Sequence, residues 1–436
     1  MNRRYFLMGT AAAAGAANLR ATDSLSDRIR IACIGVRSRG KDHINAFRKI
    51  PNVEIAAICD IDESVLSEGV ELAASNGAKK PDAFTDFRKL LEDKTIDAVS
   101  IATPNHHHTL QTIWALQAGK HVYVEKPCSH DMFEAKQITA AARKYNHLLV
   151  QHGTQNRTSP SVRDAIAKLH DGLIGEIYMA RGLCFKWRDT IGRAQEEPVP
   201  AGVHYDSWIG PAPVRPFTKN RFHYNWHWQW DYGNGDIGNQ GPHQSDICRW
   251  GLGVTYPNKV SALGGHFMFD DDQETPNVIT ASYEFRDAAG RQKHMVFEVR
   301  HWMSNHEAGL DGGIVHDSNT IGAIFYGSKG YLAIEENGRY QTWLGRDYAH
   351  GPAGFHEASH FENFIAALRS GKATDLNAPI EEGAISTTLV HLANISYRLG
   401  RTLYFDAENY RCEGDEEATA MFRRKYRAGF EVPEVA

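Results

Sequence analysis

The first residues able to bind a ligand form a short loop, Gly35-Val36-Arg37-Ser38-Arg39-Gly40. The loop follows a β-branched run and opens a helical pattern, so its backbone N–H groups and the helix N-terminus can meet a pyrophosphate. Asp60 ends the next β-branched run, where its carboxylate would accept ribose hydroxyls and repel a 2′-phosphate. The spacing predicts a site for NAD. Arg37 replaces the middle glycine, and Arg37 and Arg39 leave NADP open as the alternative.

Two further polar segments end the next β-branched runs. They are Thr103-Pro104-Asn105-His106 and Glu125-Lys126-Pro127. In doubly wound sheets, ligands bind outside the carboxyl ends of the strands. We therefore expect both segments beside the cofactor.

The order and spacing of these segments resemble the Gfo/Idh/MocA family of nicotinamide-dependent sugar oxidoreductases. The resemblance covers nearly all of the chain after the N-terminal segment, because Gly238–Asp246 and His360–Phe364 are also similar to family features. It implies a Rossmann domain, a second domain with an open sheet, and a site between them.

The resemblance assigns catalytic roles to Lys126 and His243. In the family, the lysine lies beside nicotinamide and substrate hydroxyl, and the histidine works as acid/base. An ammonium near a positively charged nicotinamide has a lowered pKa and can relay the hydroxyl proton as hydride leaves. Pro242 predicts that His243 lies in a first helical turn, where the dipole holds it neutral, and Asp246 shares its helical face. The alternative for His243 is a structural hydrogen bond.

The sequence departs from the family at Asn239, where an aspartate usually stands four residues before the histidine. An amide can position a hydroxyl but cannot take up its proton. This departure weakens the expectation of standard alcohol dehydrogenase chemistry, and Asp236 is a candidate substitute.

Aromatic residues occupy every even position from Phe222 to Tyr232, and polar residues occupy the odd ones. In an extended chain this period separates an aromatic face from a hydrogen-bonding face. The aromatics serve either as core or subunit interface, or as platforms for a sugar ring. The candidate substrate residues are Gln155, Arg157, Trp187, Trp208, Trp228, Asp246 and His360. Gln155 and Arg157 have the alternative of fastening two domains together.

The elements that must position these residues fall into two parts. From 26 to 152, β-branched runs at 28–34, 53–59, 96–102, 121–124 and 147–151 alternate with helical patterns, which predicts a doubly wound parallel sheet. From 153 to 436, longer β-prone stretches predict an open, mostly antiparallel sheet, covered by helices at 360–368 and 380–399. The predicted fold class is α/β, a Rossmann domain followed by an α+β domain.

The N-terminal segment 1–25 resembles a twin-arginine export signal. Arg3 and Arg4 precede a weak apolar run that is too short to span a bilayer. This route carries folded proteins, so a cofactor loaded in the cytoplasm would reach the periplasm inside the protein and must be restored in place. The alternative is a frayed cytoplasmic N-terminus.

Composition limits the other partners. A net charge of −5 over 436 residues gives no argument for nucleic acid, and no later stretch is apolar enough for an integral membrane protein. The histidines at 106, 107 and 108 point in different directions from a helix start, so no metal is predicted. An exposed antiparallel sheet face predicts a homo-oligomer.

Three hypotheses follow. The first is an exported NAD-dependent oxidoreductase acting on a secondary hydroxyl of a sugar or glycoside, with its cofactor reset by a second sugar. The second is an NAD-dependent glycoside hydrolase, similar to the family's hydrolytic branch, which works by transient oxidation, elimination and re-reduction. A retained cofactor and Asn239 favour it, whereas the branch's His-Gly-Gly element is absent from the sequence. The third is a cofactor-stabilised sugar-binding protein.

Overall fold

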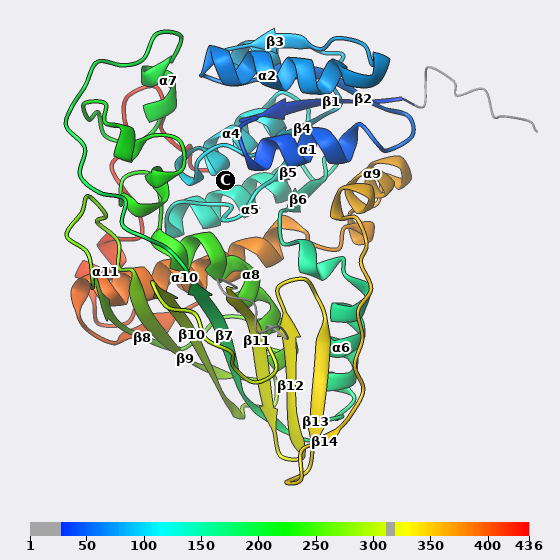
Figure 1. Cartoon of the computed structure of the whole chain (residues 1–436), viewed down its shortest axis with the longest axis vertical. Helices are drawn as coiled ribbons and strands as arrows, with labels where there is room; N and C mark the ends of the chain where they lie inside the picture. The colour runs from blue at the N-terminus through cyan, green and yellow to red at the C-terminus, as the bar shows by residue number, and fades with distance from the viewer. Residues whose placement is uncertain (1–27, 311–318, 436) are drawn as a thin grey trace, which may run out of the picture.

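The computed structural model describes residues 28–310 and 319–435 (Figure 1). The predicted export signal lies outside these residues. The described chain forms two layered parts, each built around one sheet, stacked one above the other in Figure 1.

The first part is the predicted parallel sheet, with strand order β3-β2-β1-β4-β5-β6. Its strands are β1 (Ile29–Ile34), β2 (Val53–Cys59), β3 (Asp82–Phe84), β4 (Ala98–Ile101), β5 (His121–Val124) and β6 (Val150–His152). The intervening helices are α1 (Arg39–Phe47), α2 (Glu63–Ala74), α3 (Phe87–Leu91), α4 (Asn105–Gln117) and α5 (Met132–Lys144). Separate apolar clusters bury the two faces of the sheet, which is the arrangement that strands buried on both sides require.

The second part is a ten-stranded sheet in which only β7 and β10 pair in parallel. Its strands are β7 (Ile177–Lys186), β8 (Lys259–Gly265), β9 (Val278–Arg286), β10 (Gln292–His301), β11 (Thr320–Gly327), β12 (Gly330–Glu335), β13 (Tyr340–Leu344), β14 (Ala349–His350), β15 (Leu403–Asp406) and β16 (Arg411–Cys412). The predicted open, mostly antiparallel sheet is confirmed. The helices α6 (Pro160–His170), α8 (Gly235–Leu252) and α10 (Ile380–Leu399) lie between this sheet and the first part or along its edge (Figure 1).

The prediction that helix 360–368 covers the second sheet is wrong. The helix is α9 (His360–Ser370), and it packs on the first part. Its Phe361 ring lies 5.0 Å from that of Phe47 in α1 and 4.9 Å from that of Tyr123 in β5. The apolar face of α9 is buried there, in the cluster that contains α1 and β2.

The extended conformation considered for 222–232 is also wrong. Short turns replace it, including the 3₁₀ turns Lys219–Arg221 and Asn225–Trp228. Phe222, Trp226 and Tyr232 are buried together with α7 (Tyr205–Ile209), so compact packing of large rings outweighs the alternating pattern.

The helix that carries His243 begins earlier than predicted. Pro242 lies inside α8, whose first residue is Gly235, so His243 occupies the middle of the helix. Glycines hide this helix in the sequence because they are poor helix formers. They are needed for packing: a Cβ on Gly241 would lie 3.0 Å from Val390 Cγ2 in α10.

After α11 (Glu416–Ala420) the chain returns to the first part. Val432 is buried in the cluster that contains α4 and α5, and Phe430 packs against Trp114 with ring centroids 6.3 Å apart. The Arg427 side chain donates to the Gly210 carbonyl at 2.8 Å. The C-terminal segment therefore ties α4 to the loop that follows α7.

Candidate active site

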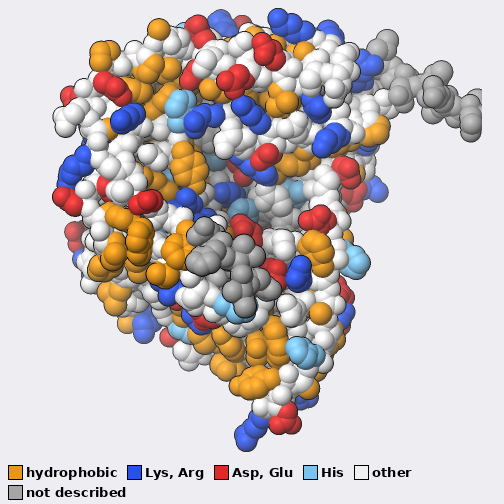
Figure 2. All heavy atoms as spheres, in the orientation of Figure 1, with side chains coloured by type: hydrophobic (Ala, Val, Ile, Leu, Met, Phe, Trp, Pro, Cys, Tyr) orange, Lys and Arg blue, Asp and Glu red, His pale blue; other side chains and the backbone are white. Residues whose placement is uncertain are grey.

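A pocket of about 320 Å³ opens at the carboxyl ends of β1, β2, β4 and β5. The surface is hollowed between the two parts, with basic and histidine side chains visible in the hollow (Figure 2). The predicted site residues that line the pocket are Gly35, Arg37, Ser38, Arg39, Asp60, Thr103, Pro104, Asn105, Glu125, Lys126, Trp208 and Asn239. The structure places Gly40, His106, Gln155, Arg157, Trp187, Trp228, His243, Asp246 and His360 outside its lining.

The glycine loop fits a dinucleotide phosphate. Gly35 has φ +75°, and a Cβ there would lie 2.8 Å from the Thr103 nitrogen. A Cβ on Gly40 would lie 1.9 Å from the Gly35 carbonyl oxygen, so only glycine permits this turn into α1. The loop backbone and the α1 N-terminus thus remain open to a phosphate.

Asp60 ends β2 at the edge of the same pocket. Its Oδ2 accepts a hydrogen bond from the Val36 amide at 2.8 Å, and its Oδ1 accepts one from the Asp62 amide at 3.0 Å. Burial raises the pKa of Asp60 to about 6. The carboxylate is ionised at neutral pH and can accept ribose hydroxyls.

Replacing Asp60 with alanine will weaken NAD binding about 10- to 100-fold, because hydrogen bonds to a charged group contribute about 1.5 to 3 kcal/mol. Titration calorimetry on the unliganded protein measures this, with NADP as the second ligand. Asp60→Asn keeps an acceptor for Val36 and should lose less. Asp82→Ala, an exposed change on neighbouring β3, is the matched control. Unchanged NAD affinity in Asp60→Ala would exclude this carboxylate as a ribose ligand.

The two arginines of the loop differ in their surroundings. Arg39 Nε donates to Glu125 Oε1 at 2.8 Å, and with its amide oriented to satisfy both neighbours, Gln155 accepts from the Arg39 guanidinium. Burial would raise the pKa of Glu125, but Arg39 holds it well below its usual value. Arg37 is exposed and lines the pocket, which leaves it as the loop arginine available to a phosphate.

The segment after β4 divides between the pocket and the protein interior. Thr103, Pro104 and Asn105 line the pocket, whereas His106 is buried with its Nε2 2.9 Å from the Trp208 carbonyl. The Asn105 side chain donates to Asn234 Oδ1 at 3.0 Å. His106 is a structural contact to α7, because a backbone carbonyl occupies its ring nitrogen.

Lys126 follows β5 and points across the pocket to α8. Its Nζ donates to the Asn239 backbone oxygen at 2.8 Å and to Asn239 Oδ1 at 3.0 Å. Burial lowers the pKa of Lys126 to about 8, against the opposing effect of the Glu125 carboxylate. A lysine whose pKa lies close to physiological pH is suited to proton transfer.

Asn239 joins Lys126 to a buried carboxylate. Its Nδ2 donates to Asp236 Oδ1 at 2.9 Å. Asp236 Oδ2 also contacts Arg188 Nε and His301 Nε2, each at 2.7 Å. Burial would raise the pKa of Asp236, but Lys186, Arg188 and His301 hold it well below its usual value. Asp236 is therefore a fixed negative charge one amide away from Lys126.

His243 does not take the predicted place. It lies mid-helix outside the pocket lining, and burial, followed by the charge on Lys126, holds its pKa well below the usual value. The predicted partnership with Asp246 is wrong, because Asp246 forms an ion pair with Arg157, Nε to Oδ2 at 2.6 Å.

His227 lines the pocket instead, together with Lys126 and Asn239. Its Nδ1 donates to the Tyr224 carbonyl at 2.6 Å, which leaves the Nε2 lone pair as an acceptor. Burial lowers its pKa to about 3, so the ring is neutral. The sequence places His227 in the hydrogen-bonding row between Phe222 and Tyr232, which could line a sugar site, but does not single it out, because that row carries no signal of which way a turn will point each side chain.

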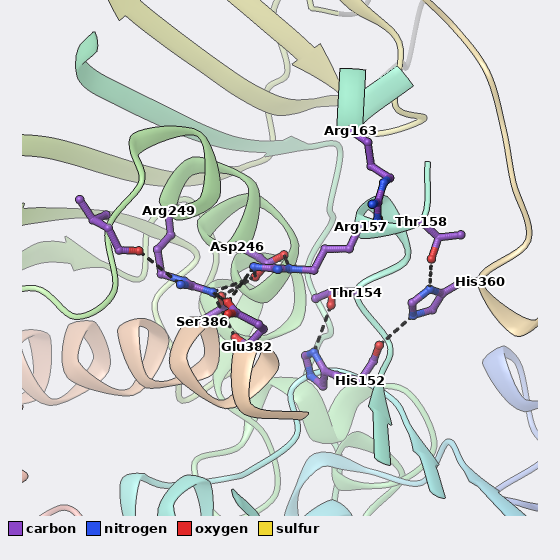
Figure 3. Close-up of polar contacts among 11 residues, drawn as sticks. His152, Thr154, Arg157, Thr158, Arg163, Asp246, Arg249, His360, Glu382 and Ser386 are labelled. Carbon is purple, nitrogen blue, oxygen red and sulfur yellow. Dashed lines mark hydrogen bonds and ion pairs between the residues drawn. The ribbon is translucent and has the colours of Figure 1, made fainter. Parts of the chain in front are cut away.

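The remaining substrate candidates have structural contacts. Trp228 is buried beneath the Arg188 guanidinium, 4.9 Å from its ring centroid, and Trp187 is exposed. Arg157 and Asp246 belong to a buried network with Arg249, Glu382 and Ser386 (Figure 3). His360 Nε2 donates to the His152 carbonyl at 2.8 Å, and His360 Nδ1 accepts from Thr158 Oγ1 at 2.6 Å. The contacts of His360 join α9 to β6 of the first part, whereas the Arg157 network lies within the second part.

Comparison with known proteins decides the family. Residues 29–153 match the NAD-binding Rossmann fold of the oxidoreductase family Gfo/Idh/MocA, and residues 167–286 and 352–432 match the C-terminal alpha/beta domain of that family. The chain belongs to the Gfo/Idh/MocA family. Residues 29–153 therefore form the family's NAD-binding domain, and the glycine loop and Asp60 are where the cofactor would be held.

Individual proteins similar to this Gfo/Idh/MocA chain have low sequence identity to it. A glycosyl hydrolase family 109 protein of Shewanella pealeana is 33% identical over 157 residues, 35% of this chain and 34% of the relative. An alpha-N-acetylgalactosaminidase of Shewanella oneidensis is 32% identical over 155 residues, 34% of this chain and 33% of that protein. The chain thus spans about a third of these curated relatives. The WlbA dehydrogenase of Bordetella pertussis, solved with NADH and UDP-GlcNAcA, shares the fold with TM-score 0.62 at 22% identity, covering 87% of this chain and 99% of that one.

Within the described residues of this Gfo/Idh/MocA protein, no helix has the length and apolar character needed to cross a membrane. The six cysteines, all in the described part, are buried and unpaired. The groups in the pocket that can take part in chemistry are Lys126, Asn239 and His227, together with the cofactor-binding loop.

Proposed function

We propose that the protein is an exported NAD-dependent oxidoreductase that oxidises or reduces a secondary hydroxyl of a sugar or glycoside and retains its cofactor. The observation that carries the proposal is Lys126, whose amine lies in the cofactor pocket with a pKa of about 8. The reaction class is supported by family membership and by Asn239 and His227, which line the pocket and can hydrogen-bond the hydroxyls of a sugar.

The chain's residues handle the proton. NAD, held at the glycine loop and Asp60, would supply the acceptor for the hydride that leaves the carbinol carbon. The neutral Lys126 amine accepts the hydroxyl proton, and the Asn239 carbonyls hold the resulting ammonium through the two hydrogen bonds already present. His227 Nε2 offers an acceptor for a neighbouring hydroxyl. In the reverse direction the ammonium returns the proton to the alkoxide.

The lysine pKa fixes the pH dependence. Oxidation needs the neutral amine, so kcat/KM for sugar oxidation should rise about tenfold per pH unit up to about pH 8 and then level off. Reduction needs the ammonium, so its kcat/KM should be level below pH 8 and fall above it. Stopped-assay rates of both directions over this range measure the two profiles. Parallel profiles in the two directions would contradict a proton relay through Lys126.

A second candidate is a redox-neutral glycoside hydrolase, favoured by the names of the Shewanella relatives. The same amine would then act on a transiently oxidised sugar, with reduction after water addition. Protein purified without added nucleotide separates the two candidates when it is offered free sugars and aryl glycosides. A lasting rise in reduced-nicotinamide absorbance with a keto-sugar supports the oxidoreductase; aglycone release without lasting absorbance supports the hydrolase.

Export enters the proposal through Arg3 and Arg4. A protein delivered folded to the periplasm must carry its nucleotide with it, which suits an enzyme whose cofactor is reset by a second sugar. Fractionation of cells expressing the chain and an Arg3→Lys/Arg4→Lys variant tests this. Equal periplasmic yields of the two would remove export from the proposal.

A further inference from the structure

A second cavity of about 290 Å³ lies where the start of α5, the loop before α8, the helix α10 and the C-terminal segment meet. It shares no lining residue with the pocket at Lys126. The proposed reaction makes no use of it.

Two buried side chains in this cavity have polar atoms without a hydrogen-bond partner among the residues described. Both ring nitrogens of His130 are in this state, although the Trp230 carbonyl lies near the ring without good hydrogen-bond geometry. His130 is 9% exposed. Asn394 donates through Nδ2 to the Asn234 carbonyl at 3.0 Å, but its Oδ1 has no donor. Buried groups of this kind carry a free-energy cost unless a ligand or water satisfies them.

A cation stands at the mouth of the cavity. The Arg398 guanidinium is exposed and lies over the Trp230 ring, 5.1 Å from its centroid. Within residues 28–310 and 319–435 no carboxylate lies within ion-pair distance of it and no hydrogen bond joins it to another side chain. A guanidinium over an indole presents a planar fork of donors to a carboxylate.

The acids around the cavity already have partners. Glu134 Oε1 pairs with Arg424 at 2.8 Å, and Asp231 pairs with Arg215. Asp131 caps α5 by accepting from the Glu134 amide at 2.8 Å. Arg398 is left without a direct ion pair, although the charges of Asp231 and Glu274 lie close enough to favour its ionised form.

Three cations line the cavity, Arg398, Arg424 and Lys425, and so do two acids, Asp131 and Asp231, so the balance of charge favours a monoanion over a phosphate dianion. Burial holds the pKa of His130 well below its usual value, so the ring is neutral and contributes a donor and an acceptor rather than a further charge. Asn394 Oδ1 contributes an acceptor. Hydroxyl groups suit both positions, since a hydroxyl can donate and accept.

We infer that this second cavity binds a small carboxylate bearing hydroxyl groups, of the sugar acid class, with its carboxylate at Arg398 and its hydroxyls at His130 and Asn394. The inference does not depend on the reaction proposed at Lys126.

Titration calorimetry of the full protein with glucuronate, and with glucose as the neutral probe, tests this inference. We expect glucuronate to bind, glucose to bind at least about tenfold more weakly, and Arg398→Gln to weaken glucuronate binding about tenfold or more. Arg398 is exposed, so the variant should fold. Arg346→Gln, an exposed arginine on the turn after β13, is the matched control.

Three results would overturn the inference. They are no glucuronate binding at millimolar concentration, equal affinity in Arg398→Gln and the native chain, and tighter binding of glucose 6-phosphate than of glucuronate. Glucuronate that binds only at the Lys126 pocket gives the second result. Turnover of the sugar substrate should be unchanged in Arg398→Gln, so failure here and failure of the proposed oxidoreductase remain distinguishable.

Discussion

Lys126→Met will lower kcat for sugar oxidation by about 10²- to 10⁴-fold while NAD remains bound. A positioned general base contributes about this factor, and methionine keeps the apolar stem while removing the amine that reaches Asn239. Single-turnover reduction of retained NAD, followed by absorbance, measures the step directly. NAD content per chain should match that of the native protein, because Lys126 is not needed to hold the phosphates.

Two further variants sharpen this result. Lys126→Arg keeps a positive charge that cannot be lost near neutrality, so it should remain as inactive as methionine. Lys144→Met, an exposed lysine near the end of α5, is the matched control and should retain full activity. Activity in Lys126→Met within about threefold of native would rule out this amine as the proton acceptor.

Asp246→Asn will destabilise the fold by about 3 to 5 kcal/mol, because it leaves buried cations without their carboxylate. The Arg157 and Asp246 side chains are 9% and 2% exposed, and Arg157 Nη2 also lies 3.0 Å from Glu382 Oε2. Ser386 Oγ donates to Asp246 Oδ1 at 2.7 Å. Urea unfolding followed by circular dichroism gives the change in the free energy of unfolding.

The same ion pair predicts an acid dependence. Burial would raise the pKa of Asp246, but Arg157 holds it below the ordinary value. The stability from this carboxylate is therefore complete above its unfolded pKa of about 4 and is lost as pH falls through the lower folded pKa.

The control for this prediction is Asp206→Asn. Its carboxylate pairs with Arg427 but is 81% exposed, so its loss should cost less than about 1 kcal/mol. If Asp246 instead bound substrate, Asp246→Asn would raise KM and leave the unfolding midpoint unchanged. That outcome would identify Asp246 as a substrate-binding residue, as the sequence predicts.

The parallel sheet was predictable because most of its strands are short, mainly apolar runs bounded by polar loops, and each loop marks a carboxyl end. Gly35, Asp60 and Lys126 follow directly from that rule, since a strand end fixes where its next residue lies. The second sheet was predictable because its longer β-prone stretches are also local sequence patterns.

Helix α8 and the residues around it were less predictable. Its interior contains Gly238, Gly241 and Pro242, whose local preferences oppose a helix, and tertiary packing against α10 overrides them. The placement of His227 depends on one turn, and that of Arg157 on a carboxylate 89 positions away in the chain. A local sequence pattern encodes neither placement.

The C-terminal segment has a consequence for the order of biosynthesis. Phe430 lines the cofactor pocket beside Trp114, and the Arg88 guanidinium lies 5.6 Å from its ring centroid. N-terminal domains can fold during synthesis, but this wall of the pocket is built by a residue that is synthesised long after the glycine loop. Capture of the nucleotide in its finished pocket must therefore follow synthesis of Phe430, and a growing chain that has not reached this residue lacks that wall.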